Sequence, residues 1–156
     1  MDTVTYPTNE VVDFVQEYLI PFRINISTTS MHEKYHTFWT PTTAVLGIKG
    51  MEAHGKQEVQ RRIGFFEADE FIATLHLGIA KVRINQKEFD TALVHLDRLL
   101  KVYPESEVVP EALYFRGVSL YKQNDDPSQL KKAYEHLLSD YPKSPWVKRA
   151  HPYRLL

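Results

Sequence analysis

Two similar segments in the second half of the chain decide the fold. They read LLKVYPESEVVPEA over residues 99–112 and LLSDYPKSPWVKRA over residues 137–150. The segments align without a gap at an offset of 38 residues, and seven of their fourteen positions are identical. A period of this length is typical of helical hairpins that stack into a solenoid. The sequence therefore predicts an all-α second half built from about two helical hairpins.

Apolar residues at helical spacing continue this pattern on both sides of the first segment. The spacing predicts a helix over residues 68–84 and three further helices before residue 151, with no strand among them. Ser106 and Asp126 stand where they would cap the helices that follow. Ala80 and Gly117 are small, and we expect paired helices to approach each other closely at these two positions.

The second half resembles tetratricopeptide repeats over about residues 68–150. The residues that carry the resemblance are Ala80, Phe89, Ala92, Leu96, Leu99 and Pro104 in the first unit, and Gly117, Leu130, Tyr134, Leu137 and Pro142 in the second. The resemblance implies a concave helix face that binds an extended peptide. With Ala80 and Gly117 at the close crossings, the residues expected in this groove are Lys81, Ile84, Glu111, Tyr114 and Tyr121. In the alternative interpretation, Tyr114 and Tyr121 pack on a neighbouring helix.

The first half of the chain has a different pattern, in which helical and strand periods alternate. We expect a helix over residues 9–19, a strand over residues 22–26, a buried strand over residues 44–48 and a more polar strand over residues 57–63. Gly64 follows the last strand, and the two glycines between residues 49 and 56 predict a hairpin loop. The predicted fold class is therefore α+β in the first half and all-α in the second.

The order of these elements around Trp39-Thr40-Pro41-Thr42 resembles thioredoxin-like proteins. The corresponding Thr-Pro bond of that family is cis, so the resemblance implies a cis-proline turn formed by Trp39, Thr40 and Pro41. The family's first strands and its Cys-x-x-Cys motif have no counterpart in this sequence. Because the chain contains no cysteine, it cannot carry out dithiol exchange. The resemblance thus implies a redox-inactive, partial thioredoxin-like domain at residues 1–67, followed by repeats at residues 68–156 that share the helix at 68–84.

An incomplete sheet of this kind has a consequence for assembly. By the same resemblance, the strands at residues 22–26 and 42–48 would flank a central strand that is missing here. Unpaired backbone groups along a strand edge are costly when buried, and an exposed edge recruits another strand. We therefore expect a homodimer joined or swapped through this sheet. The alternative is a rearranged sheet in which residues 22–26 pair directly with residues 42–48.

His32, Glu33 and His36 match the H-E-x-x-H pattern of zinc hydrolases. On a helix, the two imidazoles would share one metal ion and the carboxylate would act as general base. Lys34 places a cation beside this turn, and no pattern selects a third ligand, so surface histidines are the favoured interpretation. The sequence thus predicts neither a metal nor a cofactor. The remaining histidines share no spacing and are also expected at the surface: His54, His76, His95, His136 and His151.

The composition is that of a globular protein, with 156 residues, of which 43% are hydrophobic and 25% charged. Nineteen basic against twenty acidic residues give a net charge of −1, which argues against a general binder of nucleic acid or anionic membranes. No apolar run has the length of a membrane span, and the first ten residues show no secretory signal pattern. The lack of cysteine fits the cytoplasm.

These observations favour a non-catalytic protein-interaction or scaffold module. We expect a cytoplasmic protein with a protein or peptide partner and without a nucleic-acid or membrane partner. The alternative is the substrate-facing fragment of a longer thioredoxin-like thiol–disulfide oxidoreductase whose dithiol lies upstream. A zinc hydrolase built on His32, Glu33 and His36 is a third hypothesis.

Overall fold

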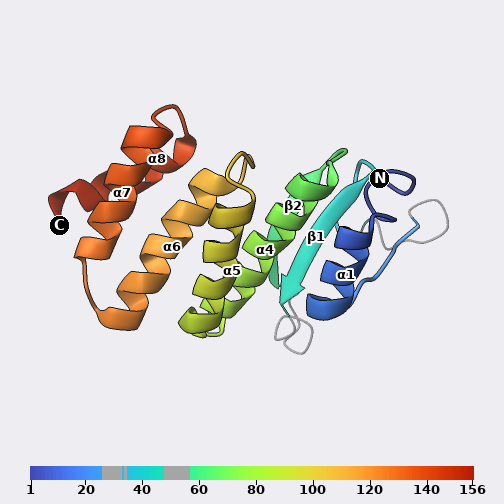
Figure 1. Ribbon diagram of the computed structural model, residues 1–156, viewed down its shortest axis with the longest axis horizontal. Coiled ribbons are helices and arrows are strands. Elements are labelled where there is room, and N and C mark those ends of the chain that lie inside the picture. Colours follow the sequence, from blue (N-terminus) through green and yellow to red (C-terminus); the bar gives the residue numbers. More distant parts are fainter. Residues whose placement is uncertain (26–32, 34, 48–56) are drawn as a thin grey trace.

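A computed structural model of the protein describes residues 1–25, 33, 35–47 and 57–156. The elements form an elongated row with the N-terminus at one end and the C-terminus at the other (Figure 1). Their order is α1 (Asn9–Tyr18), β1 (Thr42–Gly47), β2 (Gln57–Ile63), α4 (Ala68–Asn85), α5 (Phe89–Val102), α6 (Val109–Asn124), α7 (Ser128–Asp140), α8 (Pro145–Ala150) and the 3-10 helix η1 (His151–Leu155). The all-α second half is confirmed, since the described residues from 68 onward contain helices and turns but no strand.

Helix α4 is the central element of the molecule and confirms the helix predicted over residues 68–84. Every residue from Phe71 to Ala80 is buried, so the helix is covered on all sides along this stretch. Ala73, Leu77 and Ala80 belong to the core shared with α5 and α6. Phe71, Ile72, Leu75 and Ile79 belong to a second core, which they share with Val11 and Phe14 of α1 and Val45 of β1. Helix α4 therefore lies between the two hydrophobic cores and contributes side chains to both.

The two repeat segments form the same turn at both places. The N–H of Tyr103 donates to the carbonyl of Leu99 at 2.9 Å, and the N–H of Tyr141 donates to the carbonyl of Leu137 at 3.0 Å. In the first turn, Ser106 Oγ accepts a hydrogen bond from the N–H of Val108 at 3.3 Å. In the second, Ser144 Oγ accepts one from the N–H of Trp146 at 3.2 Å. The repeated YPxS sequence thus encodes a repeated helix–turn–helix geometry.

Asp126 holds the start of α7, as expected from the sequence. Its carboxylate accepts hydrogen bonds from the N–H of Ser128 at 3.0 Å and from the side chain of Gln129 at 2.8 Å. These bonds stabilise the charged form, and they lower the pKa of Asp126, the bond from Gln129 contributing most. The cap therefore helps to begin α7 directly after Pro127.

Gly117 is the point of closest approach between α6 and α7. A Cβ atom on this residue would lie 2.5 Å from the Cβ of Ala133 and 3.2 Å from the carbonyl oxygen of Gln129. Neither distance leaves room for a larger side chain. The predicted close crossing at Gly117 is confirmed, and Ala80 is fully buried in the same core.

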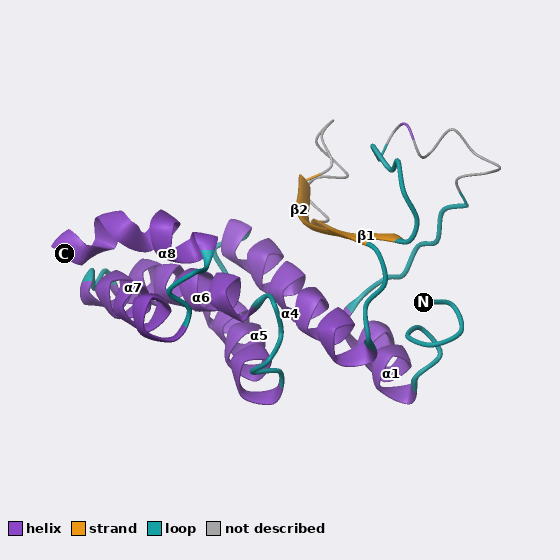
Figure 2. Ribbon diagram, turned by 90° about the horizontal axis from the view of Figure 1, so that it is seen from above, coloured by secondary structure: helices purple, strands orange, loops and turns teal. Residues whose placement is uncertain are grey.

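Strands β1 and β2 form an antiparallel hairpin in which Thr42 lies opposite Ile63, with an irregularity between Val45 and Leu46. The strand predicted over residues 57–63 is confirmed, and β1 covers the described part of the strand predicted over residues 44–48. The hairpin rests on α4 through Val45, because a Cβ on Gly78 would lie 2.7 Å from a methyl carbon of Val45. Figure 2 shows the hairpin on the side of α4 on which α8 also lies.

The thioredoxin-like sheet implied by the sequence is not found in the described part of the chain. The strand predicted over residues 22–26 is wrong for residues 22–25, which are in neither a helix nor a strand, and residue 26 lies outside the described residues. A strand must find partners for its backbone N–H and C=O groups, and β1 finds its partner in β2. The rearranged pairing of residues 22–26 with residues 42–48 is also wrong for the described residues, because residues 22–25 form no strand and the described sheet consists of β1 and β2. The predicted homodimer loses the pair of flanking strands on which it was based.

Candidate functional site

Lys81 of α4 and Glu111 of α6, two residues predicted to line a groove, form an ion pair in the structure. The two side chains are 14% and 18% exposed. The Lys81 ammonium also donates a hydrogen bond to Gln60 Oε1 of β2 at 2.6 Å, and it lies 5.1 Å from the centre of the Phe115 ring. A single cation thus connects the hairpin, α4 and α6. We call Lys81, Glu111, Tyr114 and Phe115 the α4–α6 surface.

Tyr114 extends this surface toward the C-terminal end of the array. Its hydroxyl lies 2.9 Å from the hydroxyl of Tyr153 in η1, and the two rings stack with centres 5.8 Å apart. The Tyr114 ring also lies 5.1 Å from the ring of Trp146, over which the guanidinium of Arg149 sits at 4.3 Å. Burial raises the pKa of Tyr153, and the hydrogen bond with Tyr114 raises it further. Tyr114 therefore packs on a neighbouring helix, as the alternative interpretation had it, and remains half-buried.

The other two predicted groove residues lie elsewhere on the same helices. Ile84 is half-buried and packs against the core that α4 shares with α5 and α6. Tyr121 is half-buried near the end of α6, with the ammonium of Lys122 at 5.3 Å from its ring centre. The structure thus brings Lys81 and Glu111 together, and it places Tyr114 against η1.

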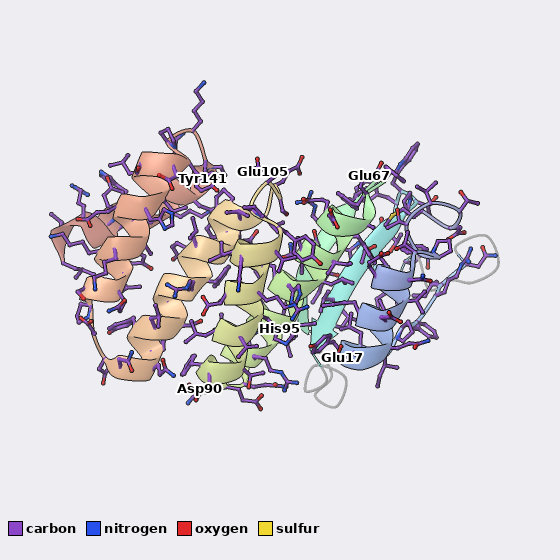
Figure 3. All side chains as sticks on the ribbon, in the orientation of Figure 1. Glu17, Glu67, Asp90, His95, Glu105 and Tyr141 are labelled. Carbon is purple, nitrogen blue, oxygen red and sulfur yellow. The ribbon has the colours of Figure 1, made fainter. Side chains whose placement is uncertain are left out.

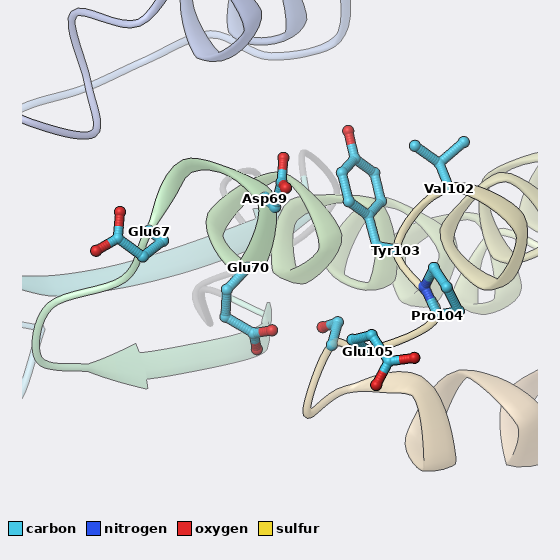
Figure 4. Close-up of a pocket in the computed structure, with 8 residues that line it drawn as sticks. Glu67, Asp69, Glu70, Val102, Tyr103, Pro104 and Glu105 are labelled. Atoms are coloured by element: carbon cyan, nitrogen blue, oxygen red, sulfur yellow. The ribbon is translucent and has the colours of Figure 1, made fainter.

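A cavity of about 290 Å³ opens where the start of α4 meets the loop between α5 and α6 (Figure 4). It is lined by Glu67, Asp69, Glu70, Val102, Tyr103, Pro104, Glu105 and Ser106. Asp69 and Glu70 stand in the first turn of α4, where carboxylates stabilise the helix dipole. Glu70 also accepts hydrogen bonds from Arg62 at 3.4 Å and from the N–H of Glu107 at 3.2 Å. Glu70 therefore fixes the loop on α4, and Asp69 stabilises the start of that helix.

A buried histidine pair is the functional candidate that the sequence interpretation missed. His76 of α4 is 1% exposed and His95 of α5 is 6% exposed, so the expectation of surface histidines is wrong for both. Their Nδ1 atoms lie 3.0 Å apart. Burial lowers the pKa of His76 to about 3, with further contributions from His95 and Arg98. Burial also lowers the pKa of His95.

A signal for this burial was present in the sequence. His76 stands between Leu75 and Leu77, and His95 precedes Leu96 in a helix whose apolar face includes Leu99. A histidine inside an apolar helical stripe is expected to face the core. Spacing between histidines, which the sequence interpretation used, carries no such information.

The other candidate residues lie near the hairpin. The Thr40–Pro41 peptide bond is cis, the geometry that the resemblance implied, and Trp39 is exposed. Thr42 Oγ1 donates to the carbonyl of Trp39 at 2.6 Å, and the N–H of Gly64 donates to the carbonyl of Pro41 at 2.8 Å. The first bond closes the turn, and the second ties the turn to the residue that follows β2.

The H-E-x-x-H residues form no metal site that the structure describes. His32 lies outside the described residues, Glu33 is exposed, and the N–H of His36 donates to the carbonyl of Glu33 at 3.1 Å. Among residues 1–25, 33, 35–47 and 57–156, no group of three or more His, Asp or Glu side chains could hold a metal ion. In those same residues no helix has the length and apolar character needed to cross a membrane.

A family model described as YfiO, outer membrane lipoprotein, matches residues 53–153. The chain belongs to the YfiO family. The match begins before β2 and runs through α8 into η1, so it covers the helical repeats. No curated protein and no solved structure matches the chain.

Membership of the YfiO family corrects two expectations. The cytoplasmic location is wrong, because the family is one of outer membrane lipoproteins. The expectation that the protein has no membrane partner loses its support for the same reason. The comparisons also give no support to a thioredoxin-like first half, whereas a helical-repeat second half agrees with the matched family. The lack of cysteine, on which the location was argued, does not determine where a protein resides.

Proposed function

We propose that this YfiO-family chain is a non-catalytic module that binds a partner protein at the outer membrane. Two observations support the proposal. The family is one of outer membrane lipoproteins, and its match covers the helical array. Stacked helical hairpins present side chains of equivalent helices along one side of the array, which suits them to binding extended protein segments.

The α4–α6 surface is the part of the array that we assign to the partner. The observation that carries this assignment is the ion pair of Lys81 and Glu111 beside the half-buried rings of Tyr114 and Phe115. The same surface continues onto α8 and η1, where it consists of Trp146, Arg149 and Tyr153. Tyrosine, tryptophan and arginine are the residues most enriched at the centres of protein interfaces, because they combine large apolar area with polar groups.

The paired charges favour a partner segment with both polar and apolar side chains. Lys81 and Glu111 satisfy each other in the free protein, so a partner of strong single charge would gain little from this surface. The exposed edges of the aromatic rings would provide the apolar contact. We therefore propose a segment of mixed composition that lies along α4, α6 and η1.

Photo-cross-linking in cells that express the natural protein tests the surface. A photoreactive amino acid would replace Tyr121, which lies about two turns beyond Tyr114 on the same side of α6 and so extends the α4–α6 surface. In a control it would replace Val94, which is 65% exposed on α5. We expect adducts with a partner protein from position 121 and none from position 94. Adducts from position 94 alone would contradict the assigned surface, and adducts from neither would contradict the interaction.

A matched pair of lysine variants then tests the residue that we place at the centre. Lys81→Met should weaken binding to the cross-linked partner by about tenfold, the effect of losing roughly 1.4 kcal/mol. Lys101→Met makes the same change at an exposed position on α5 and should leave binding unchanged. If both variants bind the partner with equal affinity, Lys81 does not belong to the interface.

Fractionation of the same cells tests the location independently. Membranes separated by density should carry the protein with the outer membrane fraction. Recovery in the soluble cytoplasmic fraction would contradict the proposed place of action, although it would leave the partner-binding surface open to the cross-linking test.

A further inference from the structure

Helix α1 is held against α4 and α5 by contacts with two buried histidines. The Phe14 ring lies 4.6 Å from the His76 ring, and the Tyr18 ring lies 5.1 Å from the His95 ring, both in edge-on arrangements. Tyr103 contacts His76 from the end of α5, at 6.2 Å between ring centres. Glu17 lies in the last turn of α1 and His95 lies near the middle of α5, and both are labelled in the lower half of Figure 3. The histidines therefore occupy the interface through which α1 is attached.

The surroundings of His76 and His95 favour the neutral form of both imidazoles. With Nδ1 atoms 3.0 Å apart, one imidazole must donate a hydrogen and the other must accept it. Two protonated rings would place two N–H groups face to face, and even one added proton would put a charge among Phe14, Tyr18 and Tyr103. The apolar setting thus disfavours protonation as long as α1 covers the pair.

The charged groups around the pair add to this effect. Arg98 on α5 opposes protonation of both histidines, and Arg83 on α4 opposes protonation of His95. Glu17 on α1 acts in the opposite direction on His95, but it is the smallest of the causes that act there. The element packed over the pair therefore brings one weak favourable charge, whereas α4 and α5 bring two unfavourable ones.

We propose that the His76–His95 pair is a proton-sensitive latch that holds α1 on the helical array, and that acidification releases α1. Release would uncover the apolar side of α4 formed by Ile72, Leu75 and Ile79, which α1 and the hairpin cover in the closed state. This conformational device uses other contacts than the α4–α6 surface, in which Lys81 contacts β2 and α6 and Tyr114 contacts α8 and η1.

The sign of the pH dependence follows from the direction of the shift. A histidine with a lowered pKa in the closed state contributes stability at a pH above its ordinary value of about 6.5. That contribution is lost as the pH falls below this value toward the lowered pKa, which is about 3 for His76. Over this range the equilibrium constant for release should rise by up to about tenfold per pH unit for each histidine that gains a proton.

Hydrogen exchange measured between pH 7.5 and pH 4.5, corrected for the intrinsic pH dependence of exchange, tests the latch. Amides of α1 should lose protection by up to about tenfold per pH unit for each histidine that gains a proton below about pH 6.5, whereas amides of α7 in the same molecule should not. Equal change in α1 and α7 would overturn the proposal, since it would indicate loss of the whole fold.

Two variants complete the test. His76→Leu/His95→Leu removes both titrating groups, and the protection of its α1 amides should no longer depend on pH. His136→Gln removes an exposed histidine of α7 that pairs with Asp140 at 3.0 Å, and it should keep the wild-type profile. A double variant that kept the wild-type profile would overturn the latch. If the double variant fails to fold, NMR titration of the wild-type histidines decides: ordinary pKa values for His76 and His95 with α1 still protected would also overturn it.

Discussion

In each of the two regions that pack on α4, a glycine lets two elements approach closely, but the elements that it joins differ. In the repeat region, Gly117 of α6 lets Ala133 of α7 approach, so that a Cβ would lie 2.5 Å from the Cβ of Ala133. In the N-terminal region, Gly78 of α4 lets the hairpin approach, and a Cβ would lie 2.7 Å from a methyl carbon of Val45. The first contact joins consecutive helices. The second joins a helix to a hairpin that precedes it in the chain.

This difference determines how each region can be derived from the sequence. Consecutive helices bury one another, so their apolar faces repeat along the chain and the period is visible. The hairpin and α1 pack on α4 through a second core, in which Val45 lies on Gly78 and Phe14 lies on His76. Because these elements are not repeats of one another, no repeat in the sequence indicates how they pack. Four sets of substitutions test and sharpen the comparison.

The largest effect is expected for Gly117→Leu. The new side chain would overlap Ala133 and the carbonyl of Gln129, which belong to a rigid helix, so α6 and α7 must separate. We expect a loss of about 3 kcal/mol in the free energy of unfolding, or about 6–12 °C in Tm. Thermal unfolding followed by circular dichroism measures it.

A compensating change sharpens this prediction. Gly117→Ala should cost less than Gly117→Leu, and Ala133→Gly should make room for the new Cβ even though glycine disfavours helices by about 1 kcal/mol. The double variant should therefore be more stable than the sum of the two single changes predicts. Strict additivity would show that the two residues do not meet.

Gly78→Ala should have a smaller and more local effect. The added methyl group would press against Val45, whose branched side chain has little freedom to move. We expect a loss of about 2 kcal/mol, seen as faster hydrogen exchange in β1 with little change in α6 and α7. Val45→Ala should relieve the overlap, so exchange in β1 that stays fast in the double variant would contradict the contact.

Breaking the Lys81–Glu111 ion pair should cost about 1–2 kcal/mol in each single variant. Lys81→Met and Glu111→Leu each leave one charge without its partner in a half-buried setting. The double variant should recover part of the loss, because two apolar side chains of similar length can pack together. Urea unfolding of the four proteins gives the coupling energy, and a coupling near zero would contradict a stabilising pair.

The smallest effects are expected at the two repeated turns. Ser106→Ala and Ser144→Ala each remove one side-chain acceptor of a backbone N–H at a helix start. Each should lower the free energy of unfolding by about 1 kcal/mol. Because the turns are equivalent, the two losses should agree within about 0.5 kcal/mol. Urea unfolding that shows a marked difference would indicate that the repeats are equivalent in sequence but not in energy.

The candidate site was predicted in part, for reasons that particular residues make clear. Lys81 and Glu111 followed from the repeat alignment, because the positions of Ala80 and Gly117 fix which way each helix faces. Tyr114 also followed from the repeat alignment. Its contact with Tyr153 did not, because it depends on η1 packing back onto the helices, and no repeat position indicates this packing. His76 and His95 were missed because the spacing between histidines was used in place of their positions in apolar helical stripes. The cover that α1 adds to them comes from a distant part of the chain.

The sequence by itself determined the helical repeats, their turns and their close crossings. Each helix of the array packs on its neighbours in the chain, so local spacing and small residues such as Gly117 specify the packing. Tertiary structure alone decided that residues 22–25 form no strand, that β1 pairs with β2, and that α1 seals the histidine pair. The physical reason is that strand pairing and burial of a polar side chain depend on the partner that arrives from elsewhere, and a short alternating pattern does not specify that partner.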